Sequence, residues 1–179
     1  MRYVLPLLLF AVPFSAFAAH DLMEQALVVG ADFSFPVAAL ITGFFATAVM
    51  TASVMLLHFV GKIGVSIPLM LGMMVSPKAS QPWQVRFGLL AHLALGSVFG
   101  LLFGYLLQSH YVFSQSNGLS GVLFGFLLWL FMMAVVLPAG RFGFFAMKVD
   151  HRLLLATFVG HVIYGLSFAY ILPIIFLHQ

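Results

Sequence analysis

Four long apolar stretches without a charged residue constrain this chain more than any other feature of its sequence. They run over residues 37–60, 87–107, 119–139 and 153–177, and none contains Asp, Glu, Lys or Arg. The hydrocarbon core of a bilayer is about 30 Å thick, and a helix needs about 20 apolar residues to cross it. Because each stretch is long enough, the sequence predicts an all-α integral membrane protein built on a bundle of four transmembrane helices.

The composition excludes a water-soluble protein. Hydrophobic residues make up 64% of the chain and charged residues 6%, whereas a soluble domain carries about a quarter charged residues. A soluble enzyme and a nucleic-acid-binding module are therefore both excluded, and the +3 formal charge does not indicate nucleic acid as a partner. The sequence contains no Cys, which also excludes disulfides and thiolate metal sites. The expected partners are the lipid bilayer and other membrane-protein subunits.

The basic residues predict how the spans are oriented. Arg2 lies near the N-terminus, and the other basic residues lie between the first and second spans or between the third and fourth: Lys62, Lys78, Arg86, Arg141, Lys148 and Arg152. Alternate crossings place all seven on one face, which the positive-inside rule makes cytoplasmic. We therefore expect a multi-pass protein of the bacterial cytoplasmic (inner) membrane, with the Lys- and Arg-bearing loops in the cytoplasm and the C-terminus in the periplasm.

The residues before the first span predict two further units. Residues 1–18 combine a basic start, a short apolar run and a final Ala-Phe-Ala, as a cleavable signal peptide does. An uncleaved N-terminal anchor helix is the alternative, and it would keep the same orientation. Residues 19–36 are expected to form an amphipathic arm on the outer face, followed by the transmembrane domain at 37–179.

One connection carries a further apolar segment. Residues 67–75, between the first and second spans, are apolar but too few to cross a bilayer. They predict an interfacial or re-entrant helix on the cytoplasmic side.

Short matches between the two halves of the chain predict an internal repeat. Residues 61–64 (Gly-Lys-Ile-Gly) follow the first span, and residues 140–143 (Gly-Arg-Phe-Gly) follow the third. In the second and fourth spans, a Gly and a Phe follow His92 and His161 at identical spacings. We therefore expect two helical hairpins of like orientation, which is a parallel repeat about an axis along the membrane normal.

Glycines recur at helical spacing within the spans and predict where the helices pack. Lipid offers no hydrophobic drive between helices, so close backbone approach at small residues holds them together. We expect these glycines to face other helices of the same chain: Gly96, Gly100, Gly104, Gly121, Gly125, Gly160 and Gly165.

His92 and His161 are the main candidates for a functional site. Both lie roughly 9 to 14 Å inside the cytoplasmic edge, given the rise of an α-helix, and ionisable groups at that depth usually face the bundle interior. The first interpretation is that each ring forms hydrogen bonds that fix helix packing, and no cofactor is then expected. The alternatives are axial ligation of a b-type haem, with Gly96 and Gly165 admitting the macrocycle, or a transition-metal or proton-relay site that His58 could join.

Methionine suggests copper as one such metal. The chain has ten Met residues, and thioethers combined with imidazoles suit Cu(I). Flexible Met side chains also fill irregular gaps in a core, so both interpretations stay open. The Met residues of the spans and of the short apolar segment are Met50, Met55, Met70, Met73, Met74, Met132 and Met133.

The pattern of residues in the spans resembles a known family. The residues that carry the likeness are 46–51 (Ala-Thr-Ala-Val-Met-Thr), His92 with Gly96, Gly125 with Trp129, 137–138 (Leu-Pro), and 160–161 (Gly-His) with Tyr164 and Gly165. In layout the chain is similar to the YagU-like four-helix membrane proteins, a family of small bacterial inner-membrane proteins of unknown function. The resemblance covers residues 37–172 and implies a four-helix fold but no reaction.

Three classes of function follow from these observations. The first is a non-catalytic accessory, assembly or structural component of a membrane complex. The second is a redox protein that binds b-type haem or a transition metal through His92 and His161. The third is a small metal or solute transporter, although the spans hold no acidic residue and few polar ones to line a path: Thr47, Thr51, Ser53 and Ser97.

Overall fold

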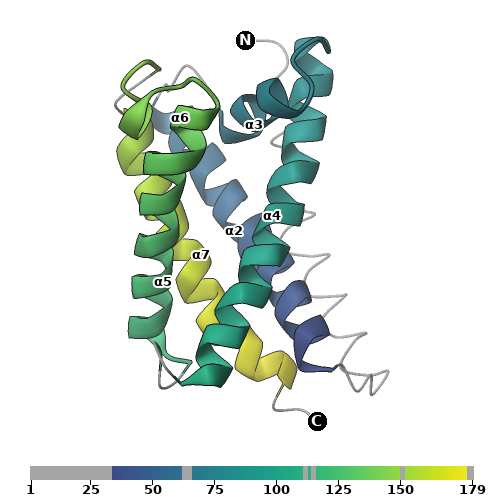
Figure 1. Ribbon diagram of the computed structural model, residues 1–179, viewed down its shortest axis with the longest axis vertical. Helices are drawn as coiled ribbons and strands as arrows, with labels where there is room; N and C mark the ends of the chain where they lie inside the picture. The colour runs from purple at the N-terminus through teal and green to yellow at the C-terminus, as the bar shows by residue number, and fades with distance from the viewer. Residues whose placement is uncertain (1–33, 62–65, 111–112, 114–115, 150–151, 177–179) are drawn as a thin grey trace.

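The computed structural model describes residues 34–61, 66–110, 113, 116–149 and 152–176, and these residues form helices joined by turns (Figure 1). The long elements are α2 (Phe35–Gly61), α4 (Gln81–Ser109), α5 (Gly118–Phe131) and α7 (Arg152–Phe176). The predicted signal or anchor segment at 1–18 lies outside the described residues. Of the predicted arm at 19–36 only the last three residues are described, and α2 already begins there.

The all-helical, four-span prediction is confirmed. Four helical segments are long and apolar enough to cross a membrane: Phe35–Val60, Gln81–Ser109, Gly118–Ala139 and Arg152–Ile175. Large apolar side chains cover their outer faces, among them Leu90, Leu119 and Leu155, which are each more than 60% exposed. A surface of this kind suits lipid rather than water, so the fold supports association with a bilayer.

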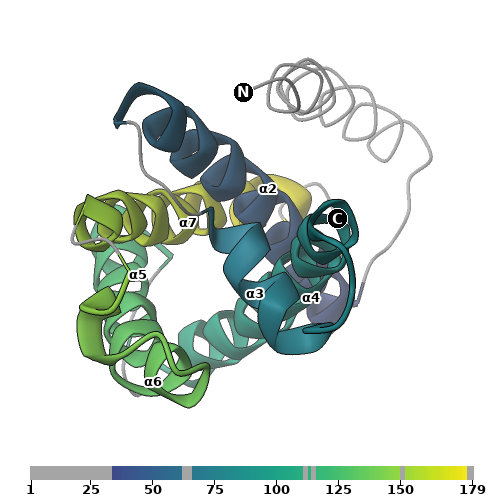
Figure 2. The same ribbon diagram turned by 90° about the horizontal axis from the view of Figure 1, so that it is seen from above.

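Close approach between glycines determines which helices pair. α2 packs against both α4 and α7, and α7 packs against α5, so that the helices form a ring (Figure 2). A Cβ atom added to Gly43 on α2 would lie 2.6 Å from the Gly96 carbonyl oxygen of α4, and one added to Gly121 on α5 would lie 2.5 Å from the Gly165 carbonyl oxygen of α7. Any larger side chain would push these helices apart.

Aromatic side chains join α4 to α5. The rings of Phe103 and Phe124 stack with their centroids 4.1 Å apart, and Phe99 meets Phe131 edge-on at 6.1 Å. Phe103 is fully buried and also contacts Phe113 and Phe168, at 5.3 and 5.0 Å. The ring of helices is therefore filled on this side by side chains instead of by close backbone contact.

The short helix α3 (Ile67–Val75) packs at the end of the bundle where α4 begins. Ser66 caps its N-terminus by accepting from the Leu69 amide, and Pro68 lies in its first turn, where a missing N–H costs nothing. α3 packs against the start of α4, where a Cβ atom on Gly72 or Gly88 would overlap the facing backbone. Met70 of α3 is buried in the bundle, at 2% exposure, whereas Met74 is 37% exposed.

The third span is not a uniform α-helix. A π-helical turn, η1 (Met132–Val136), joins α5 to the short α6 (Leu137–Ala139), and the Leu137 amide donates to the Met132 carbonyl. Pro138 supplies no N–H to the preceding turn, which favours such a departure from the regular ladder. Met132 and Met133 stand at the start of this turn.

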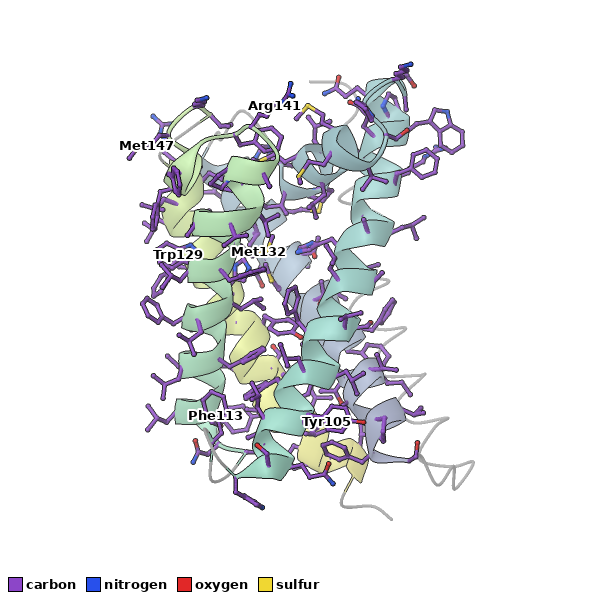
Figure 3. All side chains as sticks on the ribbon, viewed as in Figure 1. Tyr105, Phe113, Trp129, Met132, Arg141 and Met147 are labelled. Carbon is purple, nitrogen blue, oxygen red and sulfur yellow. The ribbon has the colours of Figure 1, made fainter. Side chains whose placement is uncertain are left out.

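The basic residues of the described part of the chain gather at one end of the bundle. Lys78 lies between α3 and α4, and Arg86 lies in the second turn of α4. The others lie on either side of the 3₁₀ turn η2 (Phe144–Ala146) or at the start of α7: Arg141, Lys148 and Arg152. Figure 3 shows Arg141 at this end and Tyr105 and Phe113 at the opposite end. The charge pattern of the sequence therefore corresponds to one end of the folded bundle.

We expect Gly165→Ala to lower the free energy of unfolding by about 1–3 kcal/mol, because overpacking at the α5–α7 contact outweighs the better helix propensity of Ala. Gly118→Ala is the matched control, since the nearest atom to a Cβ there is 3.1 Å away, in the Tyr170 side chain. Chemical unfolding in detergent micelles measures both. Equal stability of the two variants would contradict the packing assigned to Gly165.

Candidate functional site

The structure brings His92 and His161 into one interior site. His92 comes from α4 and His161 from α7, and their side chains are 8% and 5% exposed. The Gly96 and Gly165 contacts, four residues further along each helix, fix the two helices against α2 and α5. The two rings line the same two small cavities. Both imidazoles therefore lie in the interior of the bundle.

One hydrogen bond fixes the tautomer of His161. Its Nδ1 atom lies 2.8 Å from the Thr157 carbonyl oxygen, one turn earlier on α7. A carbonyl oxygen only accepts, so Nδ1–H must be the donor. The Nε2 atom of the neutral ring therefore carries a lone pair.

His92 has the same tautomer, which a side chain of α2 fixes. Its Nδ1 atom lies 3.1 Å from the Thr51 hydroxyl oxygen, and that hydroxyl lies 2.7 Å from the Thr47 carbonyl oxygen. The single hydroxyl proton of Thr51 goes to the carbonyl, so Thr51 accepts from His92 Nδ1–H and the Nε2 atom again carries a lone pair. Within the described part of the chain, neither Nε2 atom has a hydrogen-bond partner.

Three small cavities of the described bundle meet at His92. The central cavity, of about 20 Å³, lies between the two histidines and is lined also by Met50, Met132 and Tyr164. Met132 extends from η1 into the space between α5 and α4 (Figure 3). A water molecule needs about 10–15 Å³ of such space, so the central cavity has room for one water molecule or one metal ion.

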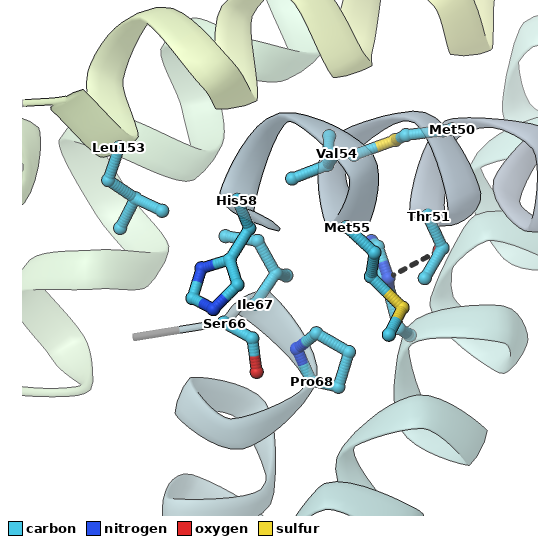
Figure 4. Close-up of a pocket in the computed structure, with 10 residues that line it drawn as sticks. Met50, Thr51, Val54, Met55, His58, Ser66, Ile67, Pro68 and Leu153 are labelled. Carbon is cyan, nitrogen blue, oxygen red and sulfur yellow. Dashed lines mark hydrogen bonds between the residues drawn. The ribbon is translucent and has the colours of Figure 1, made fainter. Parts of the chain in front are cut away.

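A second cavity lies between α3 and η1, and we call it the thioether cavity. It also measures about 20 Å³ and is lined by both histidines and by four methionines, Met70, Met74, Met132 and Met133. The third, the His58 cavity, measures about 10 Å³ and joins His58 to Met50, Met55, Thr51 and His92 (Figure 4).

His58 lines its own cavity and lies apart from the site formed by His92 and His161. It lies beside Ser66, Ile67 and Pro68 at the start of α3 (Figure 4) and does not line the central cavity. Its Nδ1 atom is buried without a hydrogen-bond partner in the described residues. Those residues hold no group of three His, Cys, Asp or Glu side chains placed for a metal ion, so a metal at the histidine pair would need thioether ligands as well.

The predicted glycines serve helix contacts. A Cβ atom added to any of the seven would meet atoms of another helix of the chain. A Cβ atom on Gly96 would overlap the Thr47 side chain, and one on Gly165 would overlap the Gly121 carbonyl. The space beside the imidazoles that a haem macrocycle would need is therefore occupied at both glycines.

Sequence reasoning missed the polar side chains that orient the rings. Thr157 lies four residues before His161 on the same helix, and that spacing could have indicated it. Thr51 is 41 residues from His92, and no local pattern connects them. The Tyr164 hydroxyl, which donates to the Gly96 carbonyl at 2.7 Å and ties α7 to α4, was likewise not predicted as part of the site.

Comparison with known proteins gives a family for the chain but no activity. A family model described as "Family of unknown function (DUF6789)" matches residues 34–176. Comparisons with curated proteins and with solved structures find no match. The prediction of a family of unknown function is confirmed, whereas the narrower likeness to the YagU-like proteins stays a prediction.

We expect Thr51→Val to lower the free energy of unfolding by about 1–3 kcal/mol, because it leaves the buried His92 Nδ1–H without an acceptor. Thr51→Ser should retain most of that stability. Ser53→Ala on the same helix is the control, since Ser53 bonds only to the carbonyl of Val49 and is exposed there. If Thr51→Val and Ser53→Ala unfold alike, Thr51 does not hold His92.

Proposed function

Because the chain belongs to the DUF6789 family, whose function is unknown, we propose a role from the geometry of its site. The protein is a non-catalytic accessory component of the membrane that holds one soft transition-metal ion between His92 and His161. The proposal joins the accessory role predicted from the sequence to the predicted metal-binding role.

The observation that carries this proposal is that His92 and His161 have the same tautomer and the same pattern of hydrogen bonding. Each donates its Nδ1–H to an oxygen of the surrounding protein, which leaves its Nε2 lone pair unused. Metal-ligating histidines are held by this same second hydrogen bond, which fixes the tautomer and the ring orientation. Both residues line the central cavity, where a metal ion would supply a partner for the two Nε2 lone pairs.

The remaining lining of the central cavity favours a soft metal. Met50 and Met132 add two thioethers to the two imidazoles, and none of the described residues that line this cavity carries a carboxylate. Thioether and imidazole donors suit Cu(I), whereas Mg²⁺ and Ca²⁺ require oxygen ligands. Met50 is almost fully buried at 2% exposure, so an ion held there is shielded from water.

Haem binding and solute transport receive less support from the same geometry. A cavity of about 20 Å³ is far too small for a haem macrocycle. Transport of a polar solute would need free hydroxyl groups along a path, but the hydroxyl groups expected to line one already form hydrogen bonds within their own helices. Those of Thr47, Thr51, Ser53 and Ser97 each donate to a carbonyl four residues earlier in their own helix, which leaves no continuous row of free donors.

The proposal also includes the location in the bacterial inner membrane, the orientation of the spans and the parallel repeat of two hairpins. The gathering of the described basic residues at the α3 end supports a cytoplasmic location for that end and a periplasmic location for the C-terminus. The Gly43–Gly96 and Gly121–Gly165 contacts occupy equivalent positions in the two hairpins, which supports the parallel repeat. We also propose that residues 1–18 form a signal peptide or an anchor helix and that the chain is related to the YagU-like proteins.

The metal site is tested on full-length protein in detergent, titrated anaerobically with Cu(I). We expect one equivalent to bind, with loss of binding in His92→Ala and in His161→Ala, because each variant removes a ligand. His110→Ala, at the far end of α4, is the control and should bind like the unaltered protein. Absence of bound metal in the unaltered protein would leave only a packing role for the histidines, and a Soret band would indicate haem instead.

The orientation is tested with single cysteines, which the Cys-free sequence allows. Cysteines replacing Lys78 and Arg141 should react with a membrane-impermeant maleimide only after the cytoplasmic face is opened. A cysteine replacing Ser109, at the other end of α4, should react in intact spheroplasts. Labelling of Lys78→Cys and Arg141→Cys from opposite sides would overturn the topology.

A further inference from the structure

The thioether cavity differs from an ordinary apolar gap in its chemistry. Four of its lining side chains are methionines, from two separate elements, and the two histidines of the central site complete the wall. Met70 and Met133 are each 2% exposed, whereas Met74 is 37% exposed at the basic end of the bundle. Soft donors therefore extend from the surface to the histidine pair.

Local structure explains how these methionines converge. Met70 and Met74 are four residues apart in α3 and so lie on one face of that helix. Met132 and Met133 lie in the π-helical turn, where Met132 lines both the thioether cavity and the central cavity. π-helical turns frequently occur at functional sites, and here the turn places one methionine between the two cavities.

We propose that the thioether cavity is the route by which Cu(I) reaches the histidine pair, and that its methionines hold the ion only in transit. The ion would bind first at Met74, pass to Met70 and Met133, and reach His92 and His161 through Met132. Each transfer exchanges one neutral soft ligand for another, so no proton or electron moves. This inference rests on the proposed function, because it takes the histidine pair as the destination.

The chain offers matched controls for the route. Met73 lies in α3 but does not line the thioether cavity, and Met147 is 80% exposed. Replacing Met by Leu conserves volume, and such changes usually cost less than about 1.5 kcal/mol. Variants can therefore remove the sulfur donors without emptying the core.

The experiment transfers Cu(I) anaerobically from its coloured bathocuproine disulfonate complex to the full-length protein in detergent. Both the rate and the final extent of transfer are followed by absorbance. We expect the triple variant M70L/M74L/M133L to load several-fold more slowly than the unaltered protein, with the final occupancy of the histidine pair retained. M73L and M147L should load at the unaltered rate. Should the triple variant fail to fold, M74L alone, altered at the exposed start of the route, should still slow loading.

The outcomes separate the two proposals. Loading of M70L/M74L/M133L or, if that variant does not fold, of M74L at the unaltered rate overturns the route while leaving the histidine site intact. Slower loading together with an equal slowing in M73L also overturns it, because the effect would then be general to α3. Lack of Cu(I) uptake by the unaltered protein overturns the proposed function, and the route with it.

Discussion

Helices inside a bilayer gain nothing from hiding apolar surface from one another, and the rest of this structure depends on how the chain meets that constraint. Close approach at Gly43 and Gly96 holds α4 against α2, and the Gly121–Gly165 contact holds α7 against α5. His92 and His161 each lie one turn from these contacts. The same packing that stabilises the bundle therefore determines where the two imidazoles are placed.

Polar groups inside the bundle are satisfied locally, and this determines the chemistry of the site. The hydroxyls of Thr47, Thr51 and Thr157 donate to carbonyls of their own helices, and the Tyr164 hydroxyl donates to α4. Imidazole nitrogens and thioether sulfurs then face the central cavity beside the hydroxyl oxygens of Thr47 and Tyr164, whose protons are already donated. A site of this composition favours a soft metal ion over a hard one.

The two halves of the bundle differ where the proposed metal route lies. α3 packs against the start of α4 and supplies Met70 and Met74, whereas the other half contributes a π-helical turn before Pro138. Both features depart from a plain helical hairpin, and both border the thioether cavity. The site is thus asymmetric although the glycine contacts on its two sides are alike.

The sequence by itself determined the class of the fold and the identity of the histidines. Span length, the lack of charge within the spans and the clustering of Lys and Arg are local or additive properties, so they predicted four helices and one basic end. The glycine contacts also followed, because spacing along one helix defines a face. Only the tertiary structure decided that Thr51 orients His92, that Met132 lies between two cavities and that His58 lies outside the central one. These relations join residues far apart in the chain, and they depend on a π-helical turn and on side-chain packing that no periodic pattern specifies.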